Sequence, residues 1–124
     1  MDTLINILSI ITGFLGNTRD FKIESEKWWK CSDNKAIKHI IRVRNTGTNT
    51  ISIKEYGLEI KQYGTIRNLV DIRLEQEEKY GFEFNMNRYH IKFKEAGKPK
   101  TIYFYAKTDS KKKKCKIMMD YIDD

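Results

Sequence analysis

The chain has 124 residues, of which 33% are charged and 40% hydrophobic, and its formal net charge is +7. This length corresponds to one domain with a single hydrophobic core. The apolar and aromatic content excludes an intrinsically disordered chain. Cys31 and Cys115 lack the close spacing of a zinc or redox motif. We expect two free thiols, with a disulfide between the first and last strands as the alternative.

Positive charge is concentrated in residues 88–116, which contain eleven Lys or Arg residues and two acidic residues. Residues 1–87 are nearly neutral, and residues 117–124 carry three acids. Such regional charge favours contact with a polyanion or with an acidic protein surface. The residues predicted to form a polyanion-binding site are Lys98, Lys100, Lys111, Lys112, Lys113 and Lys114.

Residues 1–17 contain the strongest apolar cluster and are predicted to form a short amphipathic helix that ends at Gly16-Asn17. The apolar stretch covers about twelve residues, fewer than the roughly 20 that span a bilayer. No Lys or Arg precedes Arg19, so the positive start of a signal peptide is missing. We therefore expect a cytoplasmic protein.

Three uses of this helix stay open. It could pack on the domain or self-associate, dock on a separate protein, or attach to a membrane surface. Membrane-surface helices usually carry Lys or Arg on their polar face, and this helix has none, so the membrane is the weakest alternative. The residues predicted to contact a partner are Leu4, Leu8, Ile11 and Leu15.

Residues 20–124 are predicted to form one β-domain, because short alternating segments separated by turn residues recur about every ten residues. No helical segment is expected between the strands, and the lysine run Lys111–Lys114 is predicted to be a hairpin tip. An open β-barrel is the alternative to a sandwich. The predicted strands cover residues 21–24, 37–44, 51–61, 70–74, 80–84, 89–94, 102–106 and 117–121.

One set of these segments resembles a known family. The segments are Arg42-Val43-Arg44-Asn45-Thr46-Gly47, Ile51-Ser52-Ile53, Tyr56-Gly57-Leu58-Glu59-Ile60, Leu74, Glu78-Lys79-Tyr80 and Phe82. Together they resemble small immunoglobulin-like domains of Gram-positive bacteria and their phages, over roughly residues 36–107. The resemblance implies an immunoglobulin-like antiparallel β-sandwich of about seven or eight strands, preceded by the N-terminal helix. It implies no activity, because such domains serve many roles.

No catalytic constellation can be assembled from the sequence. The two histidines exclude a His-rich metal site, and no nucleophile has both a base and an orienting group near it in a known pattern. His39 is predicted to be a core or rim residue, and His90 a solvated one. The chain is therefore predicted to be non-enzymatic, with no cofactor and no metal.

Four aromatic residues are predicted to contact a partner: Trp28, Trp29, Tyr103 and Tyr105. Successive residues of a strand face opposite sides, so one tryptophan is expected to enter the core and the other to be exposed or covered by the N-terminal helix. Both tyrosines alternate with apolar residues and are expected to point outward, either as ordinary surface residues or as stacking residues.

The preferred hypothesis is a protein-interaction module. If a phage or mobile element encodes it, the partner is expected to be a host protein that it regulates or inhibits; self-association through the N-terminal helix is the other protein contact. One alternative is a sequence-tolerant nucleic-acid-binding protein using residues 88–116, although these are mostly Lys and match no known motif. The other is a peripheral membrane protein attached through residues 3–15.

Overall fold

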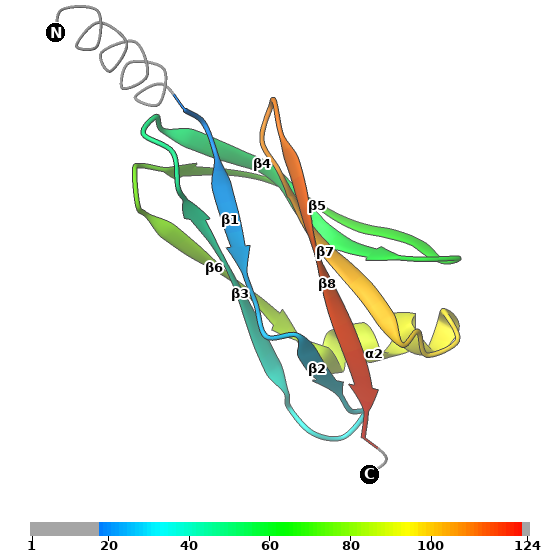
Figure 1. The fold of residues 1–124 in the computed structure, drawn as a ribbon. Coiled ribbons are helices and arrows are strands. Elements are labelled where there is room, and N and C mark those ends of the chain that lie inside the picture. The colour runs from blue at the N-terminus through cyan, green and yellow to red at the C-terminus, as the bar shows by residue number, and fades with distance from the viewer. Residues whose placement is uncertain (1–17, 123–124) are drawn as a thin grey trace, which may run out of the picture.

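The computed structural model describes residues 18–122, which form two β-sheets packed face to face (Figure 1). The smaller sheet has the order β1-β3-β6, with β1 at Phe21–Glu24, β3 at Lys38–Asn45 and β6 at Lys79–Asn85. The larger sheet has the order β2-β8-β7-β4-β5, with β2 at Trp28–Cys31, β8 at Lys112–Tyr121, β7 at Thr101–Lys107, β4 at Ile51–Ile60 and β5 at Gly64–Leu74.

The described residues confirm a mainly β sandwich of eight strands. The expectation of purely antiparallel pairing is wrong at one place, because β2 pairs with β8 in parallel. Only residues 25–27 separate β1 from β2. The chain therefore crosses from one sheet to the other without reversing, and β2 runs alongside β8 in the same direction (Figure 1).

The predicted N-terminal helix lies outside the described residues, and so do its four partner-contact residues Leu4, Leu8, Ile11 and Leu15. The roles assigned to them stay predictions. Within residues 18–122, no helix has the length and hydrophobicity required to cross a bilayer.

The strand predicted over residues 89–94 is wrong, because this segment belongs to the helix α2 (Met86–Glu95). The Asn85 side chain accepts a hydrogen bond from the backbone N–H of Asn87 at 3.0 Å and so caps the start of the helix. Gly97, with φ +81°, provides the left-handed residue that commonly follows a helix. These two end signals favour a helix over the strand that simple alternation indicates.

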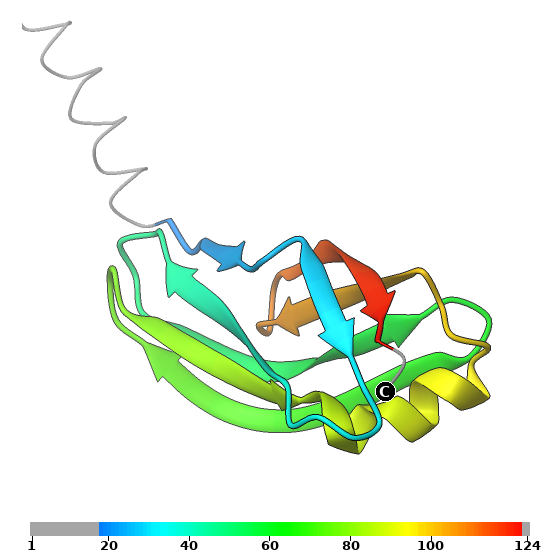
Figure 2. The same cartoon turned by 90° about the horizontal axis from the view of Figure 1, so that it is seen from below.

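The apolar residues of α2 differ in their burial. Met86 and Phe93 are buried, whereas Ile91 is 57% exposed. The true spacing of the buried face is therefore helical, and the apparent alternation of Tyr89, Ile91 and Phe93 is coincidental. The helix lies at one end of the sandwich, beside the connection between β2 and β3 (Figure 2).

Aromatic side chains from both sheets meet in the core. Phe104 of the larger sheet lies 5.7 Å from Phe82 and 5.8 Å from Phe84 of the smaller sheet, measured between ring centroids. Trp29 extends this row, with its ring 5.2 Å from Phe84. Tyr56 lies 4.2 Å from Phe82. Tilted and edge-on aromatic pairs at these separations stabilise the contact between the sheets.

The turn predicted after β3 is confirmed and is fastened by a buried side chain. The Asn45 amide donates to the carbonyl oxygens of Asn49 at 2.8 Å and of Leu74 at 3.0 Å. Its own oxygen accepts from the N–H of Gly47 at 2.9 Å. A Cβ at Gly47 would lie 2.4 Å from the carbonyl oxygen of Thr18, so glycine is required there.

The packing of the core predicts that two isoleucines contribute very differently to the free energy of unfolding. Ile102 in β7 is fully buried, whereas Ile91 in α2 is exposed. We expect Ile102→Ala to lower the free energy of unfolding by about 2–5 kcal/mol, through lost burial and a residual cavity. The matched change Ile91→Ala should stay within about 0.5 kcal/mol. Urea unfolding followed by circular dichroism measures both, and equal losses would contradict the packing described here.

Candidate binding face on the five-stranded sheet

One side of the five-stranded sheet packs on the smaller sheet, and the opposite side is here called the outer face. Its residues alternate along each strand with the core residues. The pairing register brings these positions together across four neighbouring strands. On these four strands the outer face includes Trp28, Lys30, Asp120, Met118, Lys116, Lys114, Lys112, Thr101, Tyr103, Tyr105, Lys107, Glu55, Gly57 and Glu59, and β5 adds Thr65, Arg67 and Leu69.

Trp28 is the most exposed aromatic side chain of the outer face, with 61% of its surface exposed. Its neighbour Trp29 points into the core and is fully buried, so only one of the two predicted contact tryptophans reaches the surface. Trp28 lies opposite Met118, which in turn lies opposite Thr101. Trp28 and Met118 therefore form a small apolar area beside Lys30 and Asp120, and the indole can enter a pocket on another molecule.

Tyr103 and Tyr105 both lie on the outer face, but their exposure differs. Both point outward as predicted, but Tyr103 is 37% exposed, whereas Tyr105 is 1% exposed and is not accessible as a contact residue. Its ring lies against Gly57, where an added Cβ would approach to 3.0 Å, and the missing side chain lets the ring lie flat on the sheet.

A polar contact holds Tyr105 in this position. Its hydroxyl donates to the Glu55 carboxylate at 2.6 Å, and the Lys112 ammonium lies 4.7 Å from its ring centroid. Burial, together with this carboxylate, raises the pKa of the Tyr105 hydroxyl above its usual range. Tyr105 therefore supports the outer face and does not itself offer a contact surface.

The lysine run is divided between two sides of β8. The hairpin tip is at Thr108–Lys111, where the N–H of Thr108 donates to the carbonyl of Lys111 at 2.8 Å. The predicted tip at Lys111–Lys114 is therefore wrong, since residues 112–114 lie within β8. Lys112 and Lys114 point to the outer face and reach the two oxygens of Glu59 at 2.6 and 2.7 Å.

The alternate lysines point the other way, toward β1. Lys113 lies 2.7 Å and Lys111 lies 3.2 Å from the Asp20 carboxylate. Lys113 also donates to the carbonyl oxygen of Phe21 at 2.7 Å. Of the run, only Lys112 and Lys114 thus belong to the outer face. Burial acts to raise the pKa of the Glu59 carboxyl, but hydrogen bonds from these two lysines outweigh it and lower that pKa.

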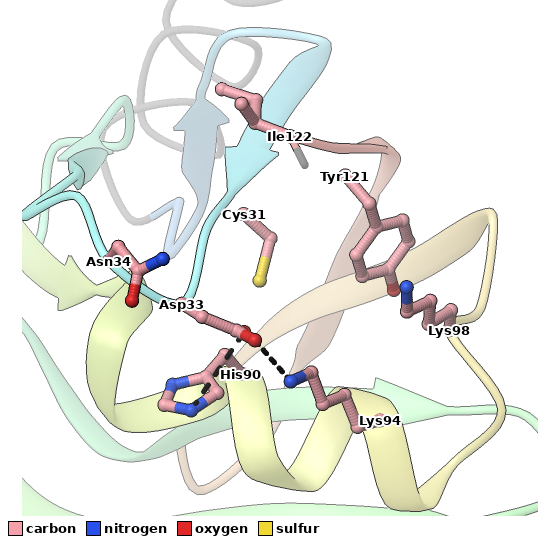
Figure 3. A pocket seen from close by; sticks show the side chains of 8 residues that line it. All are labelled: Cys31, Asp33, Asn34, His90, Lys94, Lys98, Tyr121 and Ile122. Atoms are coloured by element: carbon pink, nitrogen blue, oxygen red, sulfur yellow. Dashed lines mark hydrogen bonds and ion pairs between the residues drawn. The ribbon is translucent and has the colours of Figure 1, made fainter. Parts of the chain in front are cut away.

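The last two predicted polyanion-binding residues lie elsewhere. Lys98 and Lys100 lie between α2 and β7, outside the outer face. Lys98 lines a cavity of about 160 Å³ at the end of the sandwich (Figure 3). The structure therefore separates the six predicted lysines into three places. The cavity is lined by Cys31, Asp33, Asn34, His90, Lys94, Lys98, Tyr121 and Ile122.

In this cavity the Asp33 carboxylate is surrounded by basic side chains. Asp33 accepts a hydrogen bond from Lys94 and lies 3.9 Å from His90, so His90 is half-buried in a charged cluster and not solvated as expected (Figure 3). The Lys94 hydrogen bond lowers the pKa of Asp33. Burial raises the pKa of the Cys31 thiol, which keeps it protonated and poorly nucleophilic. This cavity was not predicted, because its residues come from three segments that are distant in the sequence.

The described part of the chain contains no cluster of metal-binding side chains. Among residues 18–122, no group of three or more His, Cys, Asp or Glu side chains is arranged to hold a metal ion. His39 is a rim residue as predicted, since it stacks on Trp29 at 4.9 Å and accepts from the N–H of Lys30 at 3.0 Å. Cys31 and Cys115 are free thiols.

Known proteins resemble this chain in fold only. No protein-family model and no curated protein matches the sequence. A β-glucosidase from Listeria innocua matches with 12% identity and a TM-score of 0.45, over 84% of this chain and 16% of that one. The alkylpurine DNA glycosylase AlkC of Pseudomonas fluorescens matches with 10% identity and a TM-score of 0.46, over 91% and 33%. The sulfur carrier protein SoxY of Chlorobium limicola matches with 6% identity and a TM-score of 0.41, over 94% and 96%.

The contact between Asp20 and Lys113 predicts a pH-dependent stability. The Lys113 hydrogen bond lowers the pKa of Asp20 from 3.8 to about 2. Since the folded pKa is below the unfolded one, the pair stabilises the fold above pH 3.8, and this is lost as the pH falls through about 2. We expect Asp20→Asn to cost about 0.5–1 kcal/mol at pH 7, because Asp20 is 42% exposed and screened.

The measurement is urea unfolding of the wild type and Asp20→Asn between neutral and acid pH. The difference between the two proteins should shrink toward zero near pH 2. A difference that is constant with pH would show that the carboxylate does not act through its charge.

Proposed function

We propose that this chain is a non-enzymatic protein-interaction module that binds an acidic patch of another protein through its outer face. The observation that carries the proposal is the 61% exposed Trp28, fixed on a strand whose next residue is locked in the core. A rigid exposed tryptophan loses little conformational entropy on binding and is enriched among the residues that dominate interface energies.

The surroundings of Trp28 favour an acidic partner. Tyr103 provides a second aromatic contact, and Lys116 lies directly opposite it on β8. Among the described residues, no ion pair engages Lys116, in contrast to Lys112 and Lys114, which share Glu59. An interface with aromatic anchors and surrounding positive charge is complementary to a hydrophobic pocket rimmed by carboxylates.

A nucleic acid is a poorer fit to this face. Glu55 and Glu59 lie on β4, at the side of this face away from Trp28, and would repel a phosphate backbone that crosses the whole face. The nearby lysines are already paired with one of these carboxylates. Tyr105, the residue best placed between the lysines, is too buried to stack on a base. The mixed charge of the outer face is thus better suited to a protein than to a polyanion.

We further propose that the sandwich is of the immunoglobulin-like type found in small domains of Gram-positive bacteria and their phages. If a phage or mobile element encodes the chain, the proposed partner is a protein of its bacterial host. The support is the turn at Asn45–Asn49, which has the Asn-x-Gly pattern and is closed by the buried Asn45 amide. Such a protein acts by occupying a surface of its target, which requires no catalytic group.

The test is affinity capture of the tagged full chain in nuclease-treated lysate of a Gram-positive bacterium, followed by calorimetry with the captured protein. Trp28→Ala should weaken binding about 30-fold, and Tyr103→Ala about 5-fold. The matched control is Tyr80→Ala, which removes an exposed tyrosine from the other sheet and should change affinity less than about 2-fold.

Two results would overturn the proposal. Binding that vanishes on nuclease treatment would indicate a nucleic acid. Affinity that is unchanged by both Trp28→Ala and Tyr103→Ala would place the contact on another surface of the chain.

A further inference from the structure

β5 is a long edge strand with a free side. It has 11 residues and lies at the end of the five-stranded sheet, where β4 is its only pairing strand among residues 18–122. It contains no proline, and its central residue Leu69 is 73% exposed. Natural proteins usually protect such an edge or use it to pair with another strand.

The sequence of β5 is complementary to itself when read in the opposite direction around Leu69. In an antiparallel pair centred there, Leu69 meets Leu69 of the second copy, and Arg67 lies opposite Asp71. On the opposite side of the strand, Ile66 lies opposite Ile72. Apolar pairs therefore form at the centre and at Ile66 and Ile72, a cation meets an anion on each side of the centre, and Asn68 lies opposite Val70.

We propose that two copies of this chain associate by antiparallel pairing of β5 with β5 around a two-fold axis at Leu69. An axis at this position makes the contact symmetric and self-complementary, as closed dimers require. The two five-stranded sheets become one continuous sheet, and each unpaired backbone group on the free edge gains a hydrogen-bonding partner.

The ion pairs within each copy would continue across the contact between the two copies. Within one copy, Arg67 lies 3.0 Å from Glu55, and Asp71 lies 3.0 Å from Lys54. Placing Arg67 opposite Asp71 of the second copy joins these pairs into a row of four charges with alternating sign. The two-fold axis generates the same row twice, so the charge pattern favours this register over a shifted one.

β5 contains one irregularity. Its three steps from Leu69 to Ile72 face only two steps of β4, from Glu55 to Ile53, so an extra residue of β5 lies beside the proposed axis. Nevertheless, exposed and half-buried residues alternate along β5 without a break from Thr65 to Arg73. The outward and inward faces are therefore maintained along the whole segment that would meet the second copy.

This contact rests on β5 alone and does not depend on the proposed function of the outer face. Since the two-fold axis is perpendicular to the joined sheet, both outer faces lie on the same side of it. A dimer would thus present two copies of Trp28 to one surface, and a divalent target would gain affinity through effective concentration.

The first test is cysteine cross-linking of the full chain. Leu69→Cys would place the two new sulfur atoms on the axis, with Cα atoms about 4.5–5.5 Å apart, which is within disulfide range. Arg73→Cys is the matched control, because it lies on the same face of the same strand. Its Cα atom would be about 26 Å from that of the second copy.

We expect Leu69→Cys to form a covalent dimer under mild oxidation and Arg73→Cys to remain monomeric on a non-reducing gel. The native Cys31 and Cys115 are present in both variants and give the same background. Cross-linking of both variants, or of neither, would overturn the proposed register.

The second test is a charge exchange followed by sedimentation velocity over about two decades of protein concentration. The wild type should show a reversible dimer, and Arg67→Asp or Asp71→Arg alone should weaken it at least about 10-fold, through like charges opposite each other. The double variant restores opposite charges between copies, although both ion pairs within each copy stay broken.

Recovery of the dimer in the double variant would therefore report the contact between copies and not local stability. Circular dichroism of each variant shows that it is folded. A wild type that is monomeric at every concentration, or a double variant as weak as the single ones, would overturn the proposal.

Discussion

The rest of the structure depends on one constraint, the strict alternation of side chains along a β-strand. Burial of Trp29 against Phe84 fixes β2, and the alternation then leaves Trp28 on the solvent side. The same rule sends Phe104 into the core and Tyr103 outward. The core therefore determines which residues of each strand reach the outer face.

Alternation also determines which charges of the lysine run Lys111–Lys114 remain available for binding. As a flexible tip it would present all its charges to a polyanion, but as part of β8 it is divided between Asp20 on one side and Glu59 on the other. Most of these lysines therefore form ion pairs that join β8 to the segments around Asp20 and Glu59. What remains at the surface is an aromatic end at Trp28 with modest positive charge, which suits a protein contact better than a phosphate backbone.

Sequence patterns predicted much of this fold, because period-two alternation and the Asn45–Asn49 turn are local signals. Residues 89–93 were misleading, since three apolar residues at alternate positions also occur by chance on a helix, and only the Asn85 cap and Gly97 distinguish the two. The burial of Tyr105 was not predictable, because it depends on Gly57 lying opposite in another strand. The charged cavity was missed for a similar reason, as its residues are distant in the sequence.

The central claim is that Trp28 is a solvent-exposed residue of the outer face. Acrylamide quenching of tryptophan fluorescence in the full chain, compared between wild type and Trp28→Phe, measures this most directly. We expect about half of the wild-type emission to be quenched readily, and we expect the remaining Trp29 emission of Trp28→Phe to be protected. Equal quenching of the two proteins would show that Trp28 is covered, and would contradict the assignment of the outer face as a free binding surface.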